Sequence, residues 1–414
     1  MQLSSESVGE VVATWAEIPR SPGHAFYDRL QILLKGAGFY VFVEDVCSRI
    51  MRREWATPSL PPGRCFRLHM VGYFEGIDSE RGIVWRCSDS LSLRDFLRLA
   101  NRDKVPDHSW LSKTRSRLPH EVHEKVFAWV LNLVAERGLV KGERIGVDGS
   151  TMEANAALRT IMRRDTGESY RQMLTRMAEE SGIATPTIDD LVRLDRKRTG
   201  KKLSNEDWTS PTDGDAKIAR MKDGTTHLAY KPEHAVDLDT GVIVAAPIHP
   251  ADEGDTTTLE PTLEEAQKNL SAVGLAPTKE DPCDLIADKS YHSRAIFYGN
   301  RNRLRSGVGK QAMRKRGEVV ERSFAHVLDR GGMRRTWLRG RENVHKRYLV
   351  HVAGYNLGIL MRALLGAGTP KEVASFTNAL VFVIHAAGAI AMVVVAAFDA
   401  EIAVLILAIA PDAV

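Results

Sequence analysis

The sequence has 414 residues, of which 43% are hydrophobic and 27% are charged, and its formal net charge is +4. This composition is ordinary for a soluble globular protein, and the length allows two or three domains with at least one large core. The four cysteines form no Cys-x-x-Cys pair and the first residues lack a basic stretch followed by an apolar one, so we expect no disulfide framework, zinc finger or secretory signal, and a reducing cytoplasm as the compartment.

Residues 1–140 are predicted to be a helical DNA-binding domain. From residue 25 onward their apolar residues are spaced three and four apart, which indicates helices. Two stretches suggest helix-turn-helix packing: one spans 79–97, and in the other Asp107 can cap the start of a helix. Lys113 and Arg117 lie on that second helix among serines, and short polar and basic side chains suit contact with DNA. The polar face of an ordinary helical bundle is the alternative.

Residues 151–226 are predicted to be a charged, mostly helical insert. Segments 169–178 and 188–195 have helical spacing, and polar, Gly- and Pro-containing segments beside them indicate loops. Asp213 and Asp215 resemble metal ligands in isolation. A turn whose side chains bond to its own backbone is the better interpretation of this pair.

From residue 227 the pattern becomes that of strands. Two β-prone runs, 227–238 and 242–248, flank an Asp-Thr-Gly turn and predict a hairpin. A helix is predicted over 256–270, followed by a short buried strand, 285–287, that leads to Asp288. This order predicts an α/β core with a mixed sheet, whose functional residues gather at strand ends.

Three acidic residues in different settings are the main functional signal. Asp148 ends the run Arg-Ile-Gly-Val-Asp, Asp288 ends a second apolar run, and Glu321 lies in a later predicted helix flanked by arginines. Two carboxylates at strand ends and a third on a helix can converge on a pair of divalent cations, and a two-metal site cuts and joins phosphodiesters. For each acid taken alone, a helix cap, a turn or an ion pair is the better interpretation.

The stretch from Lys289 to Arg347 is strongly basic. It contains 17 Lys and Arg residues against 4 acidic residues. An excess of one sign is typical of a surface that binds nucleic-acid phosphates. A solvated charged face is the alternative, but such a face usually mixes both signs.

The C-terminal residues, 371–414, form an apolar tail. Between Ala379 and Phe398 the only polar residue is His385, and a stretch of twenty apolar residues is long enough to cross a bilayer. A buried helix or helical hairpin and a frameshifted tail are the alternatives. Membrane insertion is the least favoured of the readings, because the rest of the chain resembles soluble nucleic-acid machinery.

Several motifs occur in an order that is specific as a set. They are Gly72–Gly82, Val147–Asn155, Ala235–Gly241, Ala287–His292, Val320–His326 and Gly331–Gly358. Together they make residues 20–370 resemble a DDE transposase of bacterial insertion sequences. The resemblance implies an RNase H-like catalytic core over residues 141–370, behind an N-terminal helical transposase domain.

The resemblance also implies the residues of the site and its chemistry. In this family the first Asp follows the first core strand, the second Asp follows the fourth, and the Glu is on the last core helix, so the matching positions are Asp148, Asp288 and Glu321. It implies two Mg²⁺ (or Mn²⁺) ions held by these oxygens, recognition of terminal inverted repeats, and cleavage and transfer of DNA strands. A homo-oligomer on paired DNA ends and a cytoplasmic, nucleoid-associated location follow, and no obligatory protein partner is inferred.

Basic and aromatic residues near the acids are candidates for contact with DNA. Besides Lys113 and Arg117, they are Lys289, Tyr291, Arg314, Arg322 and His326. Arg314 lies seven positions before Glu321, so the two share a face if one helix includes both, although Gly317 lies between them. Gly317 and Leu328 stand where related families often carry Arg and Lys, and those two roles are not carried over.

Two features depart from the family. Only 33 positions separate Asp288 from Glu321, where relatives have another strand and a longer insert. The loss of a strand would expose backbone groups and core surface, at a cost on the order of several kcal/mol. The apolar tail is the second departure. Both leave open a catalytically inactive DNA-binding remnant, and the core alone does not exclude an RNase H-like nuclease that cuts without joining.

Overall fold

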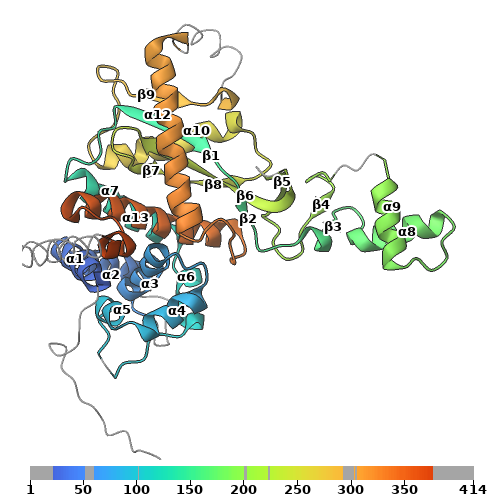
Figure 1. The fold of residues 1–414 in the computed structure, drawn as a ribbon, viewed down its shortest axis with the longest axis horizontal. Coiled ribbons are helices and arrows are strands. Elements are labelled where there is room, and N and C mark those ends of the chain that lie inside the picture. The colour runs from blue at the N-terminus through green and yellow to red at the C-terminus, as the bar shows by residue number, and fades with distance from the viewer. Residues whose placement is uncertain are drawn as a thin grey trace, which may run out of the picture.

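A bundle of helices precedes the sheet in the chain (Figure 1). The computed structural model describes residues 22–51, 60–100, 102–199, 203–221, 224–291, 303 and 305–375. Its first part is helical, as predicted, and Asp107 caps a helix by accepting a hydrogen bond of 2.8 Å from the Ser109 backbone N–H. The helices are α1 (Pro22–Gly36), α2 (Phe39–Met51), α3 (Pro62–Glu75), α4 (Glu80–Asp89), α5 (Leu91–Phe96), α6 (His108–Arg117) and α7 (His120–Ala135).

Helix α13 (Arg341–Leu365) joins this bundle to the rest of the molecule. It packs against α3, α6 and α7 on the helical side. On the sheet side, the buried Asn356 accepts a hydrogen bond from the Ile243 N–H at 3.0 Å and donates one to the Ile243 carbonyl at 2.8 Å. The helices and the sheet therefore share one continuous core, and the boundary at residue 140 stays a prediction.

The mixed sheet predicted from the sequence is confirmed, with strands in the order β2-β6-β1-β9. Strand β1 (Arg144–Gly149) is antiparallel to β6 (Thr226–Asp237) and parallel to β9 (Asp284–Ala287). Strand β6 also pairs with four short strands, and the predicted hairpin is its pairing with β7. These strands are β2 (Met152–Glu153), β5 (Lys217–Arg220), β7 (Ile243–Ala245) and β8 (Ile248–Pro250).

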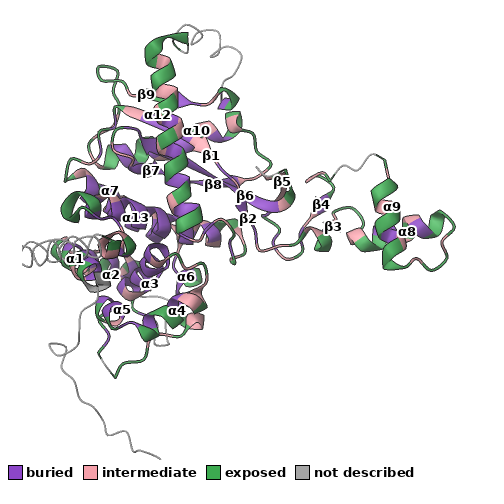
Figure 2. Cartoon of the chain, viewed as in Figure 1, coloured by how far each residue is buried: buried purple, intermediate pink, exposed green. Residues whose placement is uncertain are grey.

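Two helices cover the sheet. Helix α10 (Asp255–Ala272) packs against β6 and β7, and α12 (Gly307–Phe324) packs against β1, β6 and β9. Figure 2 shows the central strands as buried and much of the outward side of α12 as exposed. A π-helical turn, η3 (Ala325–Arg330), follows α12 directly. The face of α12 that meets the sheet thus stands beside the ends of β1 and β9.

The insert projects from the sheet as an arm (Figure 1). Helices α8 (Tyr170–Glu180) and α9 (Ile188–Lys197) confirm the two predicted helical segments, and both start at capping boxes, Ser169 with Gln172 and Thr187 with Asp190. A small sheet of β3 (Met162–Arg163) and β4 (Trp208–Thr209) forms its base. The predicted range 151–226 also includes β2 and β5, which pair with β6 in the main sheet.

Asp213 and Asp215 differ from the predicted self-contained turn. The Asp213 carboxylate accepts hydrogen bonds from the Tyr230 hydroxyl at 2.6 Å and from the Gly340 N–H at 3.2 Å. Asp215 accepts one from the Arg341 N–H at 2.9 Å. Both acids therefore stabilise the positive amino-terminal end of α13, a contact across more than 120 positions that spacing along the chain does not reveal.

The segment Arg341–Ser375 is long and apolar enough to cross a membrane, judged by length and composition alone. Its most apolar stretch is 67% buried within the protein, and its first 25 residues are α13. The apolar character of this segment is therefore that of a helix buried in the protein core. The predicted apolar tail beyond Ser375 lies outside the described residues.

Glu265 of α10 is expected to make the stability of this fold depend on pH. Burial raises the pKa of Glu265 to about 7, and its carboxylate accepts a hydrogen bond from the Ala246 N–H at 3.2 Å. A folded-state pKa above the unfolded value means that stability is lost as pH rises from about 4.5 to about 7. We expect Glu265→Gln to raise the free energy of unfolding at pH 8 by about 1–3 kcal/mol. Urea unfolding at pH 5 and pH 8 measures it, and an equal change at both values would contradict it.

Candidate active site at the ends of β1 and β9

Asp148 and Asp288 lie side by side at one edge of the sheet. Strands β1 and β9 are parallel neighbours, and Val147 pairs with Ala287. The next residue after each of these, Asp148 and Asp288, therefore lies at the same edge of the sheet. Apolar residues hold both strands in the core, so the two carboxylates project where the buried part of each strand ends. Asp148 is about one quarter exposed and Asp288 about one half.

A buried arginine of α12 lies between the two carboxylates. Arg316 Nη1 is 2.9 Å from an Asp148 oxygen, and Nη2 is 3.9 Å from an Asp288 oxygen. Nη1 also donates to the Val147 carbonyl at 3.2 Å. Arg316 is only 7% exposed. The sequence pattern does not single out Arg316, since five positions separate it from Glu321 and nothing nearby distinguishes it from its basic neighbours.

Glu321 is exposed on α12, one turn and a half beyond Arg316. It lines a pocket of about 550 Å³ together with Asp148. The other residues around this pocket include Ser150, Thr151, Glu153, His227, Asp329 and Arg334. Two of the three predicted acids therefore share one opening, and Arg316 links the third to it.

The donors at this site suit a hard divalent cation, because carboxylate oxygens are the ligands that Mg²⁺ and Mn²⁺ prefer. Among the described residues, no three His, Cys, Asp or Glu side chains are gathered closely enough to hold an ion. In this arrangement the guanidinium of Arg316 supplies the positive charge that the aspartates face.

Arg334 is a second residue whose role the sequence pattern does not reveal, although it belongs to the family motif that begins at Gly331. Its Nη1 donates to the Ser150 hydroxyl at 3.3 Å, and its Nε pairs with Asp329 at 2.7 Å. Ser150 follows Asp148 by two positions. A guanidinium at the wall of the acid-lined pocket is placed to contact an anionic group that enters it.

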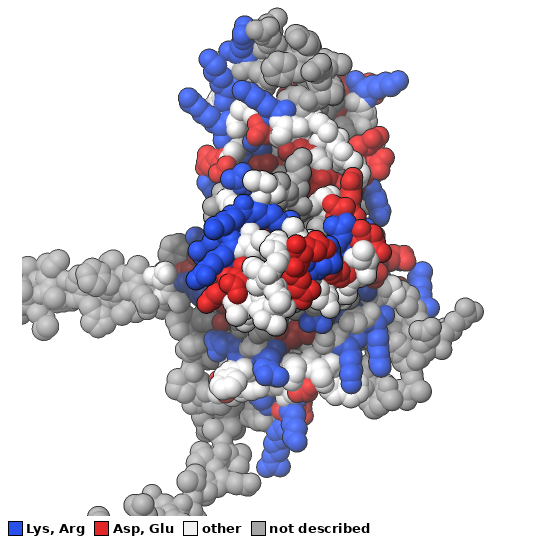
Figure 3. All heavy atoms as spheres, turned by 90° about the vertical axis from the view of Figure 1, so that its right-hand side faces the viewer, with Lys and Arg blue, Asp and Glu red and all other residues white. Residues whose placement is uncertain are grey.

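The predicted DNA-contacting residues fall into an exposed and a buried set. Lys113, Arg117, Lys289, Arg314 and Arg322 are exposed, and His326 is partly buried. Figure 3 shows Lys and Arg spread over the face it views and mixed with Asp and Glu, with several of them at the top, where Figure 1 places the start of α12. Arg314 and Glu321 lie on one uninterrupted helix, and Gly317 between them does not break it. Arg322 pairs with Glu318 on the same helix, and burial lowers the pKa of His326.

Tyr291 is placed differently from a residue at a DNA-binding surface. It is 3% exposed, and its hydroxyl donates to the Glu233 carboxylate at 2.7 Å. Glu233 is fully buried and also accepts hydrogen bonds from Thr258 and Thr262 of α10. The Glu233 network therefore anchors the turn η2 (Lys289–Tyr291), which follows Asp288, and this placement does not favour a direct contact between Tyr291 and DNA.

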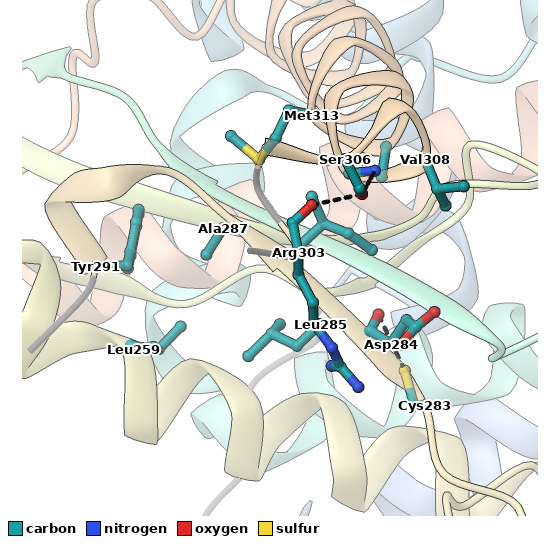
Figure 4. Close-up of a pocket in the computed structure, with 13 residues that line it drawn as sticks. Leu259, Cys283, Asp284, Leu285, Ala287, Tyr291, Arg303, Ser306, Val308 and Met313 are labelled. Atoms are coloured by element: carbon teal, nitrogen blue, oxygen red, sulfur yellow. Dashed lines mark hydrogen bonds between the residues drawn. The ribbon is translucent and has the colours of Figure 1, made fainter. Parts of the chain in front are cut away.

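Strand β9 is the edge of the sheet in the part of the chain that the structure describes. Leu285 on this strand is 44% exposed. A second pocket, of about 520 Å³, lies beside the strand and is lined mainly by apolar side chains of β9, α10 and α12, with the charged Asp284 and Arg303 among the lining residues (Figure 4). Ser306 caps α12 here by accepting from the Gly309 N–H at 3.0 Å. Residues 292–302, where relatives have a further strand after Asp288, lie outside the described residues, so the missing strand stays a prediction.

Gly146 is expected to be required for the close contact of α12 with β1. A Cβ atom at this position would lie 2.6 Å from a Leu238 methyl group, 3.1 Å from Val320 and 3.2 Å from Arg316 Cγ. We expect Gly146→Ala to lower the free energy of unfolding by about 1–3 kcal/mol. The matched control is Gly317→Ala, where a Cβ has nothing within 4 Å and the helix should gain up to about 1 kcal/mol. Chemical denaturation of both variants measures the difference, and equal signs would contradict the prediction.

Three family models match the chain. One, described as a transposase domain (DUF772), matches residues 18–117. Two, each described as a transposase DDE domain, match residues 198–305 and residues 288–361. No curated protein and no solved structure matches the chain.

Proposed function

The chain belongs to the DDE transposases of insertion-sequence type, and from this premise we propose that it recognises the terminal inverted repeats of its own element and cuts and joins DNA strands at them. The observation that carries the proposal is the adjacency of Asp148 and Asp288 at the ends of β1 and β9, with Glu321 lining the same opening as Asp148. We place the protein in the cytoplasm, associated with the nucleoid, as a homo-oligomer on paired ends.

The three carboxylates are the residues that would hold divalent metal ions. When bound, these ions supply activation of the attacking water or 3′-hydroxyl and stabilisation of the leaving oxygen. Arg334 and Ser150 orient a phosphate at the wall of the pocket. The exposed side chains of Arg314 and Lys289 contact the phosphate backbone of the DNA on either side of the acids. These contacts contribute affinity for DNA that depends on salt concentration.

The N-terminal helices provide recognition of the element ends in this proposal. Lys113 and Arg117 are exposed on α6, four positions apart on one side of the helix. The Lys113 ammonium lies 5.7 Å from the centre of the Trp110 ring. A basic and aromatic surface on a capped helix suits contact with phosphates and groove edges.

A second candidate function is DNA binding without catalysis. The observation that favours it is the short segment between Asp288 and Glu321, which spans only 33 positions. A nuclease that cuts but does not join is a third possibility, because the metals perform similar chemistry in both reactions. The long helical region before the core favours recognition of defined ends over a general nuclease.

The test is incubation of the purified chain with a supercoiled plasmid that carries the two ends of its element, with Mg²⁺ and with EDTA. Breaks at the element boundaries that require metal, followed by joined products, support the transposase. Binding without breaks supports the DNA-binding remnant. Breaks without joined products support the nuclease.

A further inference from the structure

We propose that Arg316 acts as a resident cation of the acid site: its guanidinium holds Asp148 and Asp288 together when no metal is bound, and it competes with a divalent ion for their oxygens. The inference rests on the proposed function of these carboxylates. It concerns a residue of α12 for which neither the sequence analysis nor the family comparisons provide a role.

The placement of Arg316 is specific. One nitrogen faces each aspartate, at 2.9 Å and 3.9 Å, and the nitrogen that faces Asp148 also donates to the Val147 carbonyl at 3.2 Å. The side chain reaches this position because Gly146 leaves space for its stem, with Arg316 Cγ 3.2 Å from where a Cβ of Gly146 would lie. A guanidinium in a fixed fork is suited to two oxygens from different chain segments.

Burying the charged side chain of Arg316 costs free energy, and a packing role alone would not offset this cost. The residue is 7% exposed, and its buried Nε has no hydrogen-bond partner among the described residues. A buried charge is tolerated when it is paired, and the carboxylates of Asp148 and Asp288 are the pairing groups here. The charge of Arg316 is therefore retained in the interior by the same two oxygens that a metal ion would use.

Repulsion between the carboxylates of Asp148 and Asp288 is the physical reason for a cation at this position. Two carboxylates at adjacent strand ends repel each other in the absence of a cation, which destabilises the edge of the sheet where they meet. Arg316 removes that repulsion. The same positive charge reduces the attraction of the site for a divalent ion, so the site binds metal more weakly than the carboxylates alone would.

The test is the affinity of the full chain for Mn²⁺, measured by calorimetry without DNA, in the wild type and in Arg316→Met and Arg316→Gln. The expected result is an affinity at least about ten-fold tighter in both variants, as expected from removal of one charge about 4 Å from the ion. In the absence of metal both variants melt at a lower temperature than the wild type. Mn²⁺ raises their melting temperature more than it raises that of the wild type.

Lys315→Met is the matched control, because it removes one positive charge from the adjacent position. The Lys315 ammonium is bound to Asp239 at 2.9 Å, away from the two catalytic aspartates. Its Mn²⁺ affinity should stay within about two-fold of the wild-type value. Arg316→Lys, which keeps a charge, should also stay within about two-fold.

The outcomes separate this inference from the proposed function. Suppose that the wild type binds Mn²⁺ and Asp148→Asn does not, but that neither uncharged Arg316 variant binds Mn²⁺ more tightly than the wild type. The resident-cation proposal is then overturned, and the proposed metal site is supported. Weaker binding in these variants overturns the resident-cation proposal equally. If the wild type and both Arg316 variants bind no Mn²⁺ in an Asp148-dependent way, the proposed metal site itself fails.

Discussion

We expect Asp148→Asn to reduce cleavage of element-end DNA by at least about a thousand-fold, because a lost metal ligand removes on the order of several kcal/mol of transition-state stabilisation. Asp148 is the acid that both pairs with Arg316 and lines the open pocket. The measurement is the rate of nicking of end-containing DNA at saturating Mg²⁺. Binding of the same DNA, measured by gel shift, should change little.

The same loss of cleavage is expected at Glu321, and a nearby glutamate on the same helix provides a matched control. Glu321→Gln should reduce cleavage to the same degree as Asp148→Asn. Glu318→Gln makes the same chemical change three positions earlier on α12, where the side chain is 65% exposed and pairs with Arg322. Its rate should stay within about three-fold of the wild-type rate, since surface changes have small effects. Normal cleavage in Asp148→Asn or Glu321→Gln would reject the assignment of that acid.

The largest effect on stability is expected from Glu233→Ala. The Glu233 carboxylate is fully buried and accepts hydrogen bonds from Tyr291 and from two threonines of α10, while Lys231 and His249 lie 3.7 Å away. The substitution leaves these donors without an acceptor and opens a cavity. We expect the free energy of unfolding to fall by about 3 kcal/mol or more, as measured by urea denaturation.

Two further variants define the cause of that loss. Glu233→Gln keeps the size of the side chain and one acceptor, so it should cost about half as much as the alanine variant. Glu264→Ala removes an exposed glutamate of α10 and should change stability by less than about 0.5 kcal/mol. If all three variants unfold at the same urea concentration as the wild type, the buried network does not stabilise the fold.

The Glu233 network also connects the core to the candidate site. Tyr291 is three positions after Asp288 and is tied to β6 and α10 through Glu233. Glu233→Ala should therefore lower cleavage even at temperatures well below its unfolding transition. This result would assign Glu233 and Tyr291 a positioning role, because neither lines the pocket that Asp148 and Glu321 share among the described residues.

Much of the fold was predictable from local pattern. The spacing of apolar residues identified the helices before residue 140, α8, α9 and α10, and the Asp-Thr-Gly turn identified the pairing of β6 with β7. These signals are readable because helix and strand periods and turn residues act over a few positions. The positions of Asp148 near the end of β1 and of Asp288 directly after β9 followed from the same kind of signal, since an apolar run stops where a strand ends.

The rest depended on contacts between distant parts of the chain. Arg316 reaches the Val147 carbonyl across 169 positions, and the Tyr291 hydroxyl reaches Glu233 across 58. Asp213 meets the start of α13 across 127 positions. A sequence shows which side chains carry charge, but only the packing of α12 on β1 and of α10 on β6 decides which charges are buried together.

The sequence by itself determined the α/β class, the order of the elements and the family resemblance, because each is encoded in short runs of residues, while the roles of the three acids stay a prediction. The tertiary structure decided that Arg316 lies between Asp148 and Asp288, that Tyr291 is buried, and that β9 is the edge of the described sheet. The physical reason is that burial and charge pairing depend on which segments fold against one another, and the periodicity of one segment carries no information about its partner.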